Sequence, residues 1–185
     1  MLVRYAVKEG DRVADCGSGT GTTALMAADK AGPSGHVTLL DVSPGMLSVA
    51  REKAAKIGLL NRLDFMTGDM DQLPFDNDSF DVALSTYSLC PLYAPSKGAM
   101  ELLRVVRPGG LIGVAHSTTP RNPVVRWLGD KIENFAWRFP WLSMGCRAVD
   151  VLPTLESAGA KVIFEKRIGV PFWPFLVFVV QKPKG

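Results

Sequence analysis

The sequence is poor in cysteine and histidine. Three cysteines among 185 residues are sparse and odd in number, which argues against a disulfide framework and favours a reducing, cytoplasmic compartment. No Cys/His group has zinc-ligand spacing, and there are only two histidines. We therefore expect neither structural disulfides nor a bound metal.

Strong charge and long apolar runs are also lacking. The net charge of +3 comes from 21 Lys+Arg against 18 Asp+Glu, too small an excess to predict nucleic acid as a partner. The longest apolar run, residues 170–180, contains two prolines and is far shorter than the roughly 20 residues that span a bilayer. Charged residues follow Met1 too soon for a secretory signal. We expect one soluble domain over residues 1–185, at most peripheral at a membrane.

Short apolar segments alternate with helical stretches, the pattern of an α/β protein with a parallel sheet. Arg107-Pro108-Gly109-Gly110 is typical of a turn. The last two apolar segments are close enough in sequence to predict an antiparallel hairpin. The expected strands are 12–16, 36–41, 63–67, 80–85, 111–116, 161–167 and 175–181, and the expected helices are 22–31, 43–57, 96–106 and 149–158.

A glycine-rich segment, VADCGSGTG at 13–21, follows the first expected strand and precedes a helix. Glycine lets the backbone turn tightly and approach a ligand closely. The spacing is GxGxG, so the dinucleotide fingerprint GxGxxG fails at Thr22, and no Gly-Lys-Ser/Thr of a phosphate loop follows. A plain strand-to-helix turn would not need three glycines preceded by Asp15.

Two further acidic residues follow expected strands. Asp41 lies 20 residues after Gly21, where a carboxylate of a βαβ unit can accept hydrogen bonds from both ribose hydroxyls. Asp69 follows the third strand, at the edge of the sheet where ligands bind. The alternatives are a helix-entry residue for Asp41 and an ordinary loop carboxylate for Asp69.

Four ordered motifs together resemble the class I S-adenosylmethionine-dependent methyltransferases, in particular the branch with ubiquinone/menaquinone-biosynthesis enzymes. They are VADCGSGTG at 13–21, LLDVSPGMLSVAREKA at 39–54, GDMDQLPFDNDSFDVAL at 68–84 and ELLRVVRPGGLIGVAHS at 101–117. The resemblance implies a Rossmann-like seven-stranded sheet flanked by helices, with strand order 3-2-1-4-5-7-6 and strand 7 antiparallel.

The resemblance also implies S-adenosyl-L-methionine as cofactor and S-adenosyl-L-homocysteine as product. The family's cofactor contacts are carried over to the matching positions of this sequence. Asp15, Gly17, Gly19 and Gly21 would form the methionine-side pocket, Asp41 would bind the ribose, Val42 and Met46 would line the adenosine, Asp69 and Met70 would contact the adenine, and Ser85 with the residues up to 90 would flank the sulfonium.

Two residues are candidates for the chemistry of the acceptor. His116 ends the fifth strand and has an ordinary pKa near neutral, which suits a general base, although it is equally a polar residue at a strand end. Tyr87 follows the fourth strand, with Ser88 and Cys90 beside it as substrate-wall residues. Cys90 is also readily interpreted as a small buried hydrophobe.

Some methyltransferase chemistries do not fit. The Asn/Asp-Pro-Pro-aromatic tetrad of DNA amino-methylating enzymes is replaced by Ser85-Thr86-Tyr87-Ser88, and the Pro-Cys of cytosine-C5 enzymes is reversed at Cys90-Pro91. The paired glutamates of protein arginine methyltransferases are absent. Arsenite methyltransferases use several cysteines, which Cys90 and Cys146 match only in part.

The Trp-rich segment 118–147 lies where class I enzymes often insert substrate-recognition elements. Its apolar residues from Val124 to Phe139 recur at helical spacing, with Trp127, Lys131 and Arg138 along one border. This stripe either packs on the domain or forms a lid or interfacial helix over an apolar acceptor. We therefore expect methyl transfer to a small, apolar acceptor of the quinone-precursor, lipid or thiol type.

Other classes of function remain open. The chain could be a cofactor-binding module without catalysis, or a methyltransferase that acts on RNA or protein. A homodimer is a further expectation. The glycine segment begins near residue 15, so Met1–Glu9 would supply little N-terminal cap, with Tyr5 as the aromatic residue near the cofactor. The site would then be open, covered by a partner or membrane, or completed by residues upstream of Met1.

Overall fold

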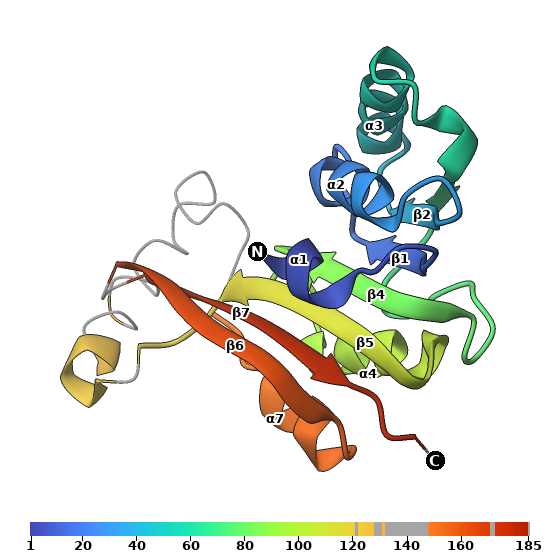
Figure 1. The fold of residues 1–185 in the computed structure, drawn as a ribbon. Helices are drawn as coiled ribbons and strands as arrows, with labels where there is room; N and C mark the ends of the chain where they lie inside the picture. Colours follow the sequence, from blue (N-terminus) through green and yellow to red (C-terminus); the bar gives the residue numbers. More distant parts are fainter. Residues whose placement is uncertain (121, 128–130, 132–147, 171–172, 185) are drawn as a thin grey trace.

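The computed structural model describes residues 1–120, 122–127, 131, 148–170 and 173–184. Seven strands form one sheet in the order β3-β2-β1-β4-β5-β7-β6, as the resemblance predicted (Figure 1). Strands β1 to β5 are parallel, and β7 is antiparallel to both β5 and β6. The strands are β1 (Arg12–Cys16), β2 (His36–Asp41), β3 (Leu63–Thr67), β4 (Phe80–Thr86), β5 (Val106–Ser117), β6 (Lys161–Val170) and β7 (Trp173–Gln181).

Helices cover both faces of the sheet and bury a core on each (Figure 1). One core lies under α1, α2 and α3, and the other lies under α4 and α7. The helices are α1 (Leu2–Ala6), α2 (Thr22–Ala31), α3 (Pro44–Lys56), α4 (Pro95–Val105) and α7 (Leu152–Ser157), with a 3₁₀ turn at Leu60–Arg62. Buried Val, Leu and Ile side chains alternate between the two cores along the strands, which fixes the register of the sheet.

The sequence encodes the helix boundaries locally. Ser43 caps α3 by accepting a hydrogen bond from the Met46 N–H, and Pro44 occupies the first helical position. The expected C-terminal helix is shorter than its apolar pattern, because it begins at Leu152 rather than at residue 149. Residues 123–127 are helical, and the remainder of the predicted Trp-rich helix falls outside the described residues.

The predicted turn at residues 107–110 lies inside β5, which already begins at Val106, and the pairing with β4 shifts register across it. Val106 pairs with Phe80 of β4, and the Gly109 N–H donates to the carbonyl of Lys182 at 3.1 Å. The Gln181 side chain also donates to the Gly109 carbonyl at 2.8 Å. Contacts with distant segments therefore keep these residues within the strand, although their sequence alone favours a turn.

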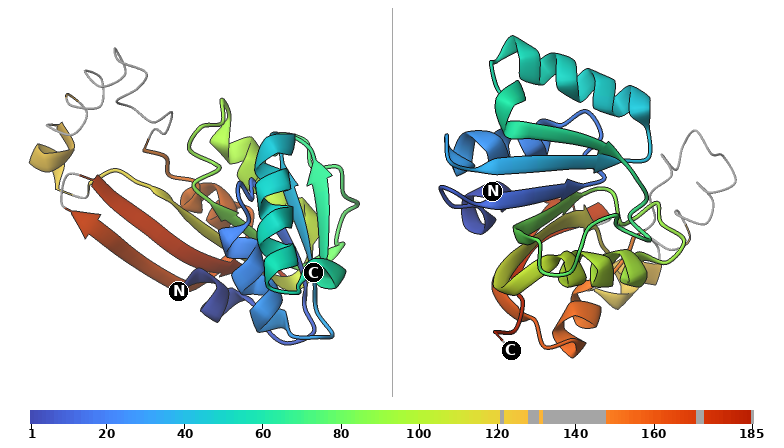
Figure 2. Two further views of the ribbon diagram at one scale, coloured as in Figure 1. Left: turned by 90° about the horizontal axis from the view of Figure 1, so that it is seen from above. Right: turned by 90° about the vertical axis from the view of Figure 1, so that its right-hand side faces the viewer.

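The C-terminal hairpin of β6 and β7 forms one edge of the sheet. Figure 2 shows it, in orange and red, extending away from the blue and green helices near the other edge. Tyr5 of α1 stacks on Phe164 of this hairpin, with ring centroids 4.1 Å apart. Within the described residues, no helix combines the length and apolar character needed to cross a membrane.

Candidate functional site

The glycine segment makes a tight turn between β1 and α2. The N–H groups of Gly17 and Ser18 donate to the carbonyl of Leu40 at 2.7 and 3.0 Å, which ties the turn to β2. Gly17, Gly19 and Gly21 have φ angles of 72°, 53° and 79°. Because L-residues rarely adopt this left-handed region, all three positions favour glycine.

The three glycines differ in what surrounds them. A Cβ atom on Gly17 would lie 2.2 Å from Cβ of Ser88, and one on Gly21 would lie 2.8 Å from Cβ of Ala50. A Cβ on Gly19 would meet no atom within 4 Å. Gly17 and Gly21 therefore allow close packing, whereas Gly19 borders open space where a ligand can approach the backbone.

Asp41 connects β2 to the glycine turn. Its Oδ2 accepts a hydrogen bond from the Gly19 N–H at 2.7 Å, and its Oδ1 accepts one from the Ser43 N–H at 2.9 Å. Each carboxylate oxygen keeps a second lone pair. The carboxylate is only partly buried, so it can accept hydrogen bonds from a pair of neighbouring hydroxyl groups.

A cavity of about 400 Å³ opens at the carboxyl ends of β1, β2, β3 and β4. Parallel sheets bind ligands at this edge, where the strand order reverses beside β1. The cavity brings together seven of the predicted site residues: Gly17, Gly19, Asp41, Val42, Met46, Met70 and Tyr87. Its other lining residues are Leu40, Ser43, Gly68, Thr86, Ser88, Pro91 and Leu92.

Sequence reasoning did not name most of that second group as cofactor residues. Thr86 and Ser88 fall in the stretch after β4 that the resemblance placed beside the sulfonium. Pro91 and Leu92 carry no motif signal, and only the fold brings them over the glycine turn. Ser88 fits there because its hydroxyl donates to the Cys16 carbonyl at 2.9 Å.

Asp15 lies beneath the cavity rather than in its wall. Its side chain is fully buried, and neither carboxylate oxygen has a hydrogen-bond partner of normal geometry among the described residues. Burial raises the pKa of Asp15 to about 7, the N–H of Ala24 opposes that shift, and the charge of Asp41 adds to it. A buried carboxyl group of this kind favours a cation or hydrogen-bond donors nearby.

The loop between β3 and β4, residues 68–79, is held by two side chains of α4. The Arg104 guanidinium donates to the carbonyls of Phe75 and Leu73 at 2.7 and 3.0 Å. Glu101 accepts from the Leu73 N–H at 2.8 Å and pairs with Arg104. Asp69 lies exposed in this loop between Gly68 and Met70, which both line the cavity.

The structure does not bring four other predicted residues into the cavity lining. Gly21 packs on α3, and Ser85 is fully buried with its hydroxyl 2.7 Å from that of Ser88. Tyr5 stacks on Phe164 instead of contacting the cavity. His116 is fully buried and does not face the cavity as we expected.

The two candidate catalytic residues are in contrasting environments. Burial lowers the pKa of His116, and its Nδ1 lies 2.9 Å from the Ser117 carbonyl, where Nδ1–H can donate. Its Nε2 has no hydrogen-bond partner among the described residues. Tyr87 is 51% exposed, lines the cavity and has a left-handed φ of 58°. Such strained residues concentrate at functional sites.

The described residues contain no cluster of three or more His, Cys, Asp or Glu side chains that could hold a metal ion. They do fit S-adenosylmethionine in three respects. Gly19 borders open space, Asp41 offers a partly buried carboxylate, and Asp15 holds two buried oxygens without a hydrogen-bond partner of normal geometry. The space at Gly19 allows close approach of the ligand, Asp41 can accept hydrogen bonds from ribose hydroxyls, and Asp15 can interact with a positively charged group.

A pair of glycine variants tests the turn. Gly17→Ala should lower the free energy of unfolding by more than about 2 kcal/mol, because left-handed strain adds to the clash with Ser88. Gly19→Ala should cost only the strain, about 1–2 kcal/mol, because its Cβ has space. Urea unfolding curves measure both, and equal losses would contradict this difference between the two positions.

Comparison with known proteins supports the same assignment. A family model described as a methyltransferase domain matches residues 13–110. A demethylmenaquinone methyltransferase from Clavibacter sepedonicus is 42% identical over 118 residues, which cover 63% of this chain and 45% of the relative. A ubiquinone/menaquinone biosynthesis C-methyltransferase UbiE from Ectopseudomonas mendocina is 33% identical over 119 residues, covering 64% and 46%. The chain spans about half the length of these curated relatives.

Solved structures share the fold. A SAM-dependent methyltransferase from Aquifex aeolicus has a TM-score of 0.70 and 23% identity, covering 97% of this chain and 86% of that one. A geranyl diphosphate methyltransferase in complex with SAM has a TM-score of 0.79 and 13% identity, covering 98% and 82%. The [4+2]-cyclase SpnF has a TM-score of 0.77 and 22% identity, covering 100% and 80%. The family match and the strand order agree, and the chain belongs to the class I S-adenosylmethionine-dependent methyltransferases.

Proposed function

We propose that this chain transfers the methyl group of S-adenosylmethionine to a small, apolar acceptor and releases S-adenosylhomocysteine. The observation that carries the proposal is the cavity that joins the glycine turn and Asp41 to a mostly apolar wall. The curated relatives named for quinone biosynthesis support an acceptor of the quinone-precursor type. A lipid or thiol acceptor would use the same kind of wall.

Different residues around the cavity would contact different parts of the cofactor. Asp41 would accept hydrogen bonds from the ribose hydroxyls, with Val42 and Met46 beside the adenosine. The loop residues Asp69 and Met70 would contact the adenine. On the methionine side, the glycine turn lets the ligand approach the backbone closely, and Asp15 supplies a buried carboxyl group. The positive charge of the cofactor would favour the ionised form of this carboxyl group.

When bound, S-adenosylmethionine supplies an electrophilic methyl group on its sulfonium. The chain must then align the acceptor for in-line displacement and exclude water. Tyr87 is better placed than His116 to contact the acceptor, because it lines the cavity and its ring packs edge-on against Phe175 of β7. A thiolate acceptor needs no base, whereas a phenol must lose its proton.

His116 remains a candidate base of a particular kind. Burial keeps its imidazole neutral near neutral pH, and Nδ1 bonded to the Ser117 carbonyl would leave Nε2 free to accept a proton. A His116→Gln variant therefore distinguishes acceptors that need a base from those that do not.

The rim of the cavity favours an apolar acceptor. Tyr87 is 51% exposed, and Pro91 of the same loop after β4 is also exposed. Val124 and Trp127 are also exposed, at 72% and 63%, so the described part of the Trp-rich segment does not bury them against the domain. Such side chains suit contact with a lipophilic acceptor or the surface of a membrane that holds it.

Methyl-labelled S-adenosylmethionine tests the proposal with a panel of acceptors. We expect label on hydroquinones, lipophilic thiols or phospholipid vesicles, and less on polar amines, protein or RNA. Tyr87→Phe keeps the ring and removes the hydroxyl, so it should affect hydroxyl acceptors more than thiols. The reverse ranking of acceptor classes would overturn the apolar assignment.

The same assay separates catalysis from cofactor binding. If calorimetry shows that S-adenosylhomocysteine binds but no acceptor class gains label, the chain is a binding module rather than a methyltransferase. The distinction requires measurement because the cyclase SpnF shares this fold, and a fold does not determine the reaction.

A further inference from the structure

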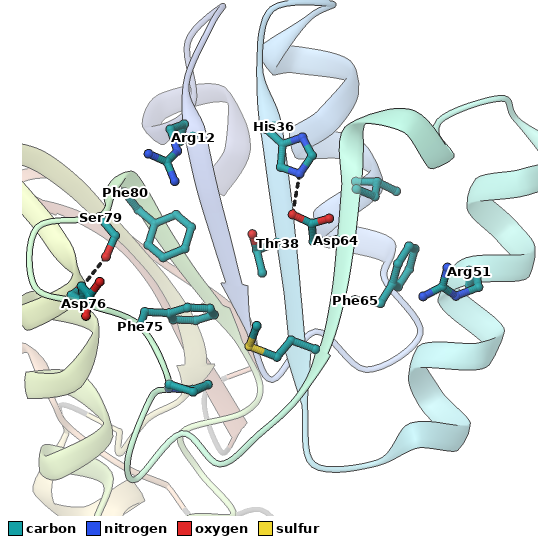
Figure 3. Close-up of a pocket in the computed structure, with 13 residues that line it drawn as sticks. Arg12, His36, Thr38, Arg51, Asp64, Phe65, Phe75, Asp76, Ser79 and Phe80 are labelled. Carbon is teal, nitrogen blue, oxygen red and sulfur yellow. Dashed lines mark hydrogen bonds and ion pairs between the residues drawn. The ribbon is translucent and has the colours of Figure 1, made fainter.

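A second hollow, of about 580 Å³, lies away from the cavity described above. It opens over the amino-terminal halves of β1, β2 and β3, beside the loop 68–79 (Figure 3). The chain between β3 and β4 forms no helix, so this part of the sheet is uncovered on the face opposite α2. Its size is within the range of small-molecule sites, about 300–1,000 Å³.

Aromatic rings form one wall of the hollow. Phe75 and Phe80 meet edge to face, with centroids 4.9 Å apart and an interplanar angle of 78° (Figure 3). Thr38 of β2 lies on the floor beside them and makes no hydrogen bond through its hydroxyl within the described chain. The wall and floor together offer a ring surface next to a hydroxyl that can donate or accept.

Two arginines line the hollow. The Arg12 guanidinium is 6.0 Å from the centre of the Phe80 ring and forms no ion pair among the described residues. Arg51, on the far side of β3, rests on Phe65 at 4.3 Å and likewise forms no ion pair there. Asp81 of β4 accepts a hydrogen bond from the backbone N–H of Arg12 at 2.8 Å and forms an ion pair with Arg107 at 2.6 Å, and the charge of Arg12 also acts on it. The carboxylate of Asp64 lies 2.8 Å from His36.

Two arginines and two aspartates border the hollow, and all four side chains are exposed, so the ligand's charge is selected by the group that lies beside the aromatic wall. Arg12 and Thr38 are the groups that face the space between Phe80 and His36 (Figure 3). A guanidinium beside an aromatic wall binds the anionic group of a planar ligand while the ring packs on the wall.

We propose that this hollow is a second ligand site, which takes a small planar aromatic anion with its ring against Phe75 and Phe80 and its charged group at Arg12. The site does not depend on the proposed methyl transfer. No residue lines both sites, although neighbouring parts of the same elements do: in the loop 68–79, Gly68 and Met70 line the first cavity, whereas Pro74 and Phe75 line the hollow.

The probe for this site is 8-anilinonaphthalene-1-sulfonate, an aromatic sulfonate that fluoresces when bound. Wild-type protein should bind it in the presence of saturating S-adenosylhomocysteine. Arg12→Met should weaken binding at least tenfold, and Arg12→Lys less than that because it retains the charge. Arg4→Met, at an exposed arginine of α1, is the matched control and should leave the dissociation constant unchanged. Arg12 is exposed, so these variants should keep the melting temperature of the wild type.

Two results would overturn the site. One is equal affinity of the wild type and Arg12→Met for the probe. The other is displacement of the probe by S-adenosylhomocysteine with no effect of Arg12→Met, which would place the probe in the first cavity. Failure of the proposed methyl transfer alone would leave this binding experiment unaffected.

Discussion

Asp41→Ala should weaken the binding of S-adenosylhomocysteine about a hundredfold or more in calorimetry. The substitution removes the proposed acceptor for the ribose hydroxyls, and hydrogen bonds to a charged group contribute about 1.5–3 kcal/mol each. It also removes the bonds that Asp41 accepts from the N–H groups of Gly19 and Ser43, so the glycine turn loses one of its ties to the start of α3. Cofactor affinity should therefore fall through both effects.

Two variants make this result interpretable. Asp41→Asn keeps an oxygen that can accept from the Gly19 N–H, so it should retain the turn and show an intermediate affinity. Asp29→Ala, at an exposed carboxylate of α2, should bind like the wild type. If Asp41→Ala retained wild-type affinity while remaining folded by circular dichroism, the assignment of the ribose site to Asp41 would be wrong.

The second large effect concerns Asp15 and pH. The ordinary pKa of an aspartic acid is 3.8, and burial raises that of Asp15 to about 7 in the folded chain. Between these values the folded state holds a proton that the unfolded state has released. The free energy of unfolding should therefore fall as pH rises from about 4 to about 7, by a few kcal/mol, and then level off.

Asp15→Asn should remove that dependence. The amide has no charge to bury, so the variant should be more stable than the wild type at pH 8 by a few kcal/mol, and similar to it near pH 4. It should also bind S-adenosylmethionine more weakly, because the variant lacks the negative charge that the cationic ligand favours. Urea unfolding from pH 4 to 8 measures the first effect, and calorimetry at pH 8 the second.

Asp29→Asn is the matched control, since this carboxylate is exposed on α2. It should leave both the slope of stability against pH and the cofactor affinity unchanged. A wild-type stability that rises steadily from pH 4 to 7 would contradict a protonated Asp15 in the free protein. Equal stability of Asp15→Asn and the wild type at pH 8 would do the same.

Local signals were sufficient for much of this fold. Ser43-Pro44 marks the start of α3, and the alternation of apolar segments marks each strand within a residue or two for most of the sheet. The strand order itself came from the resemblance, since composition alone cannot order parallel strands. The exceptions are β6, which runs to Val170 instead of residue 167, and β5, where hydrogen bonds to the C-terminal residues extend the strand through a Pro-Gly-Gly sequence.

The site was predictable only where a residue type was required by the backbone or by charge. The left-handed glycines and Asp41 belong to that class. Tyr5 and His116 were placed from their positions along the chain, and their side-chain directions depend on packing with Phe164 and Phe178 that no local pattern reveals. Pro91 and Leu92 reach the cavity because the loop after β4 folds back over Gly17.

The hydrogen bonds of Arg104 to the loop 68–79 affect how ligands enter and leave the cavity. Arg104 donates to two carbonyls of this loop, and Glu101 accepts from the Leu73 N–H. These bonds hold that side of the cavity in place. The opposite rim carries Val42 and Met46, whose side chains are 66% and 46% exposed. We therefore expect S-adenosylhomocysteine to leave, and S-adenosylmethionine to enter, past the side chains of Val42 and Met46. Bulkier residues at these two positions should slow turnover without changing the chemical step.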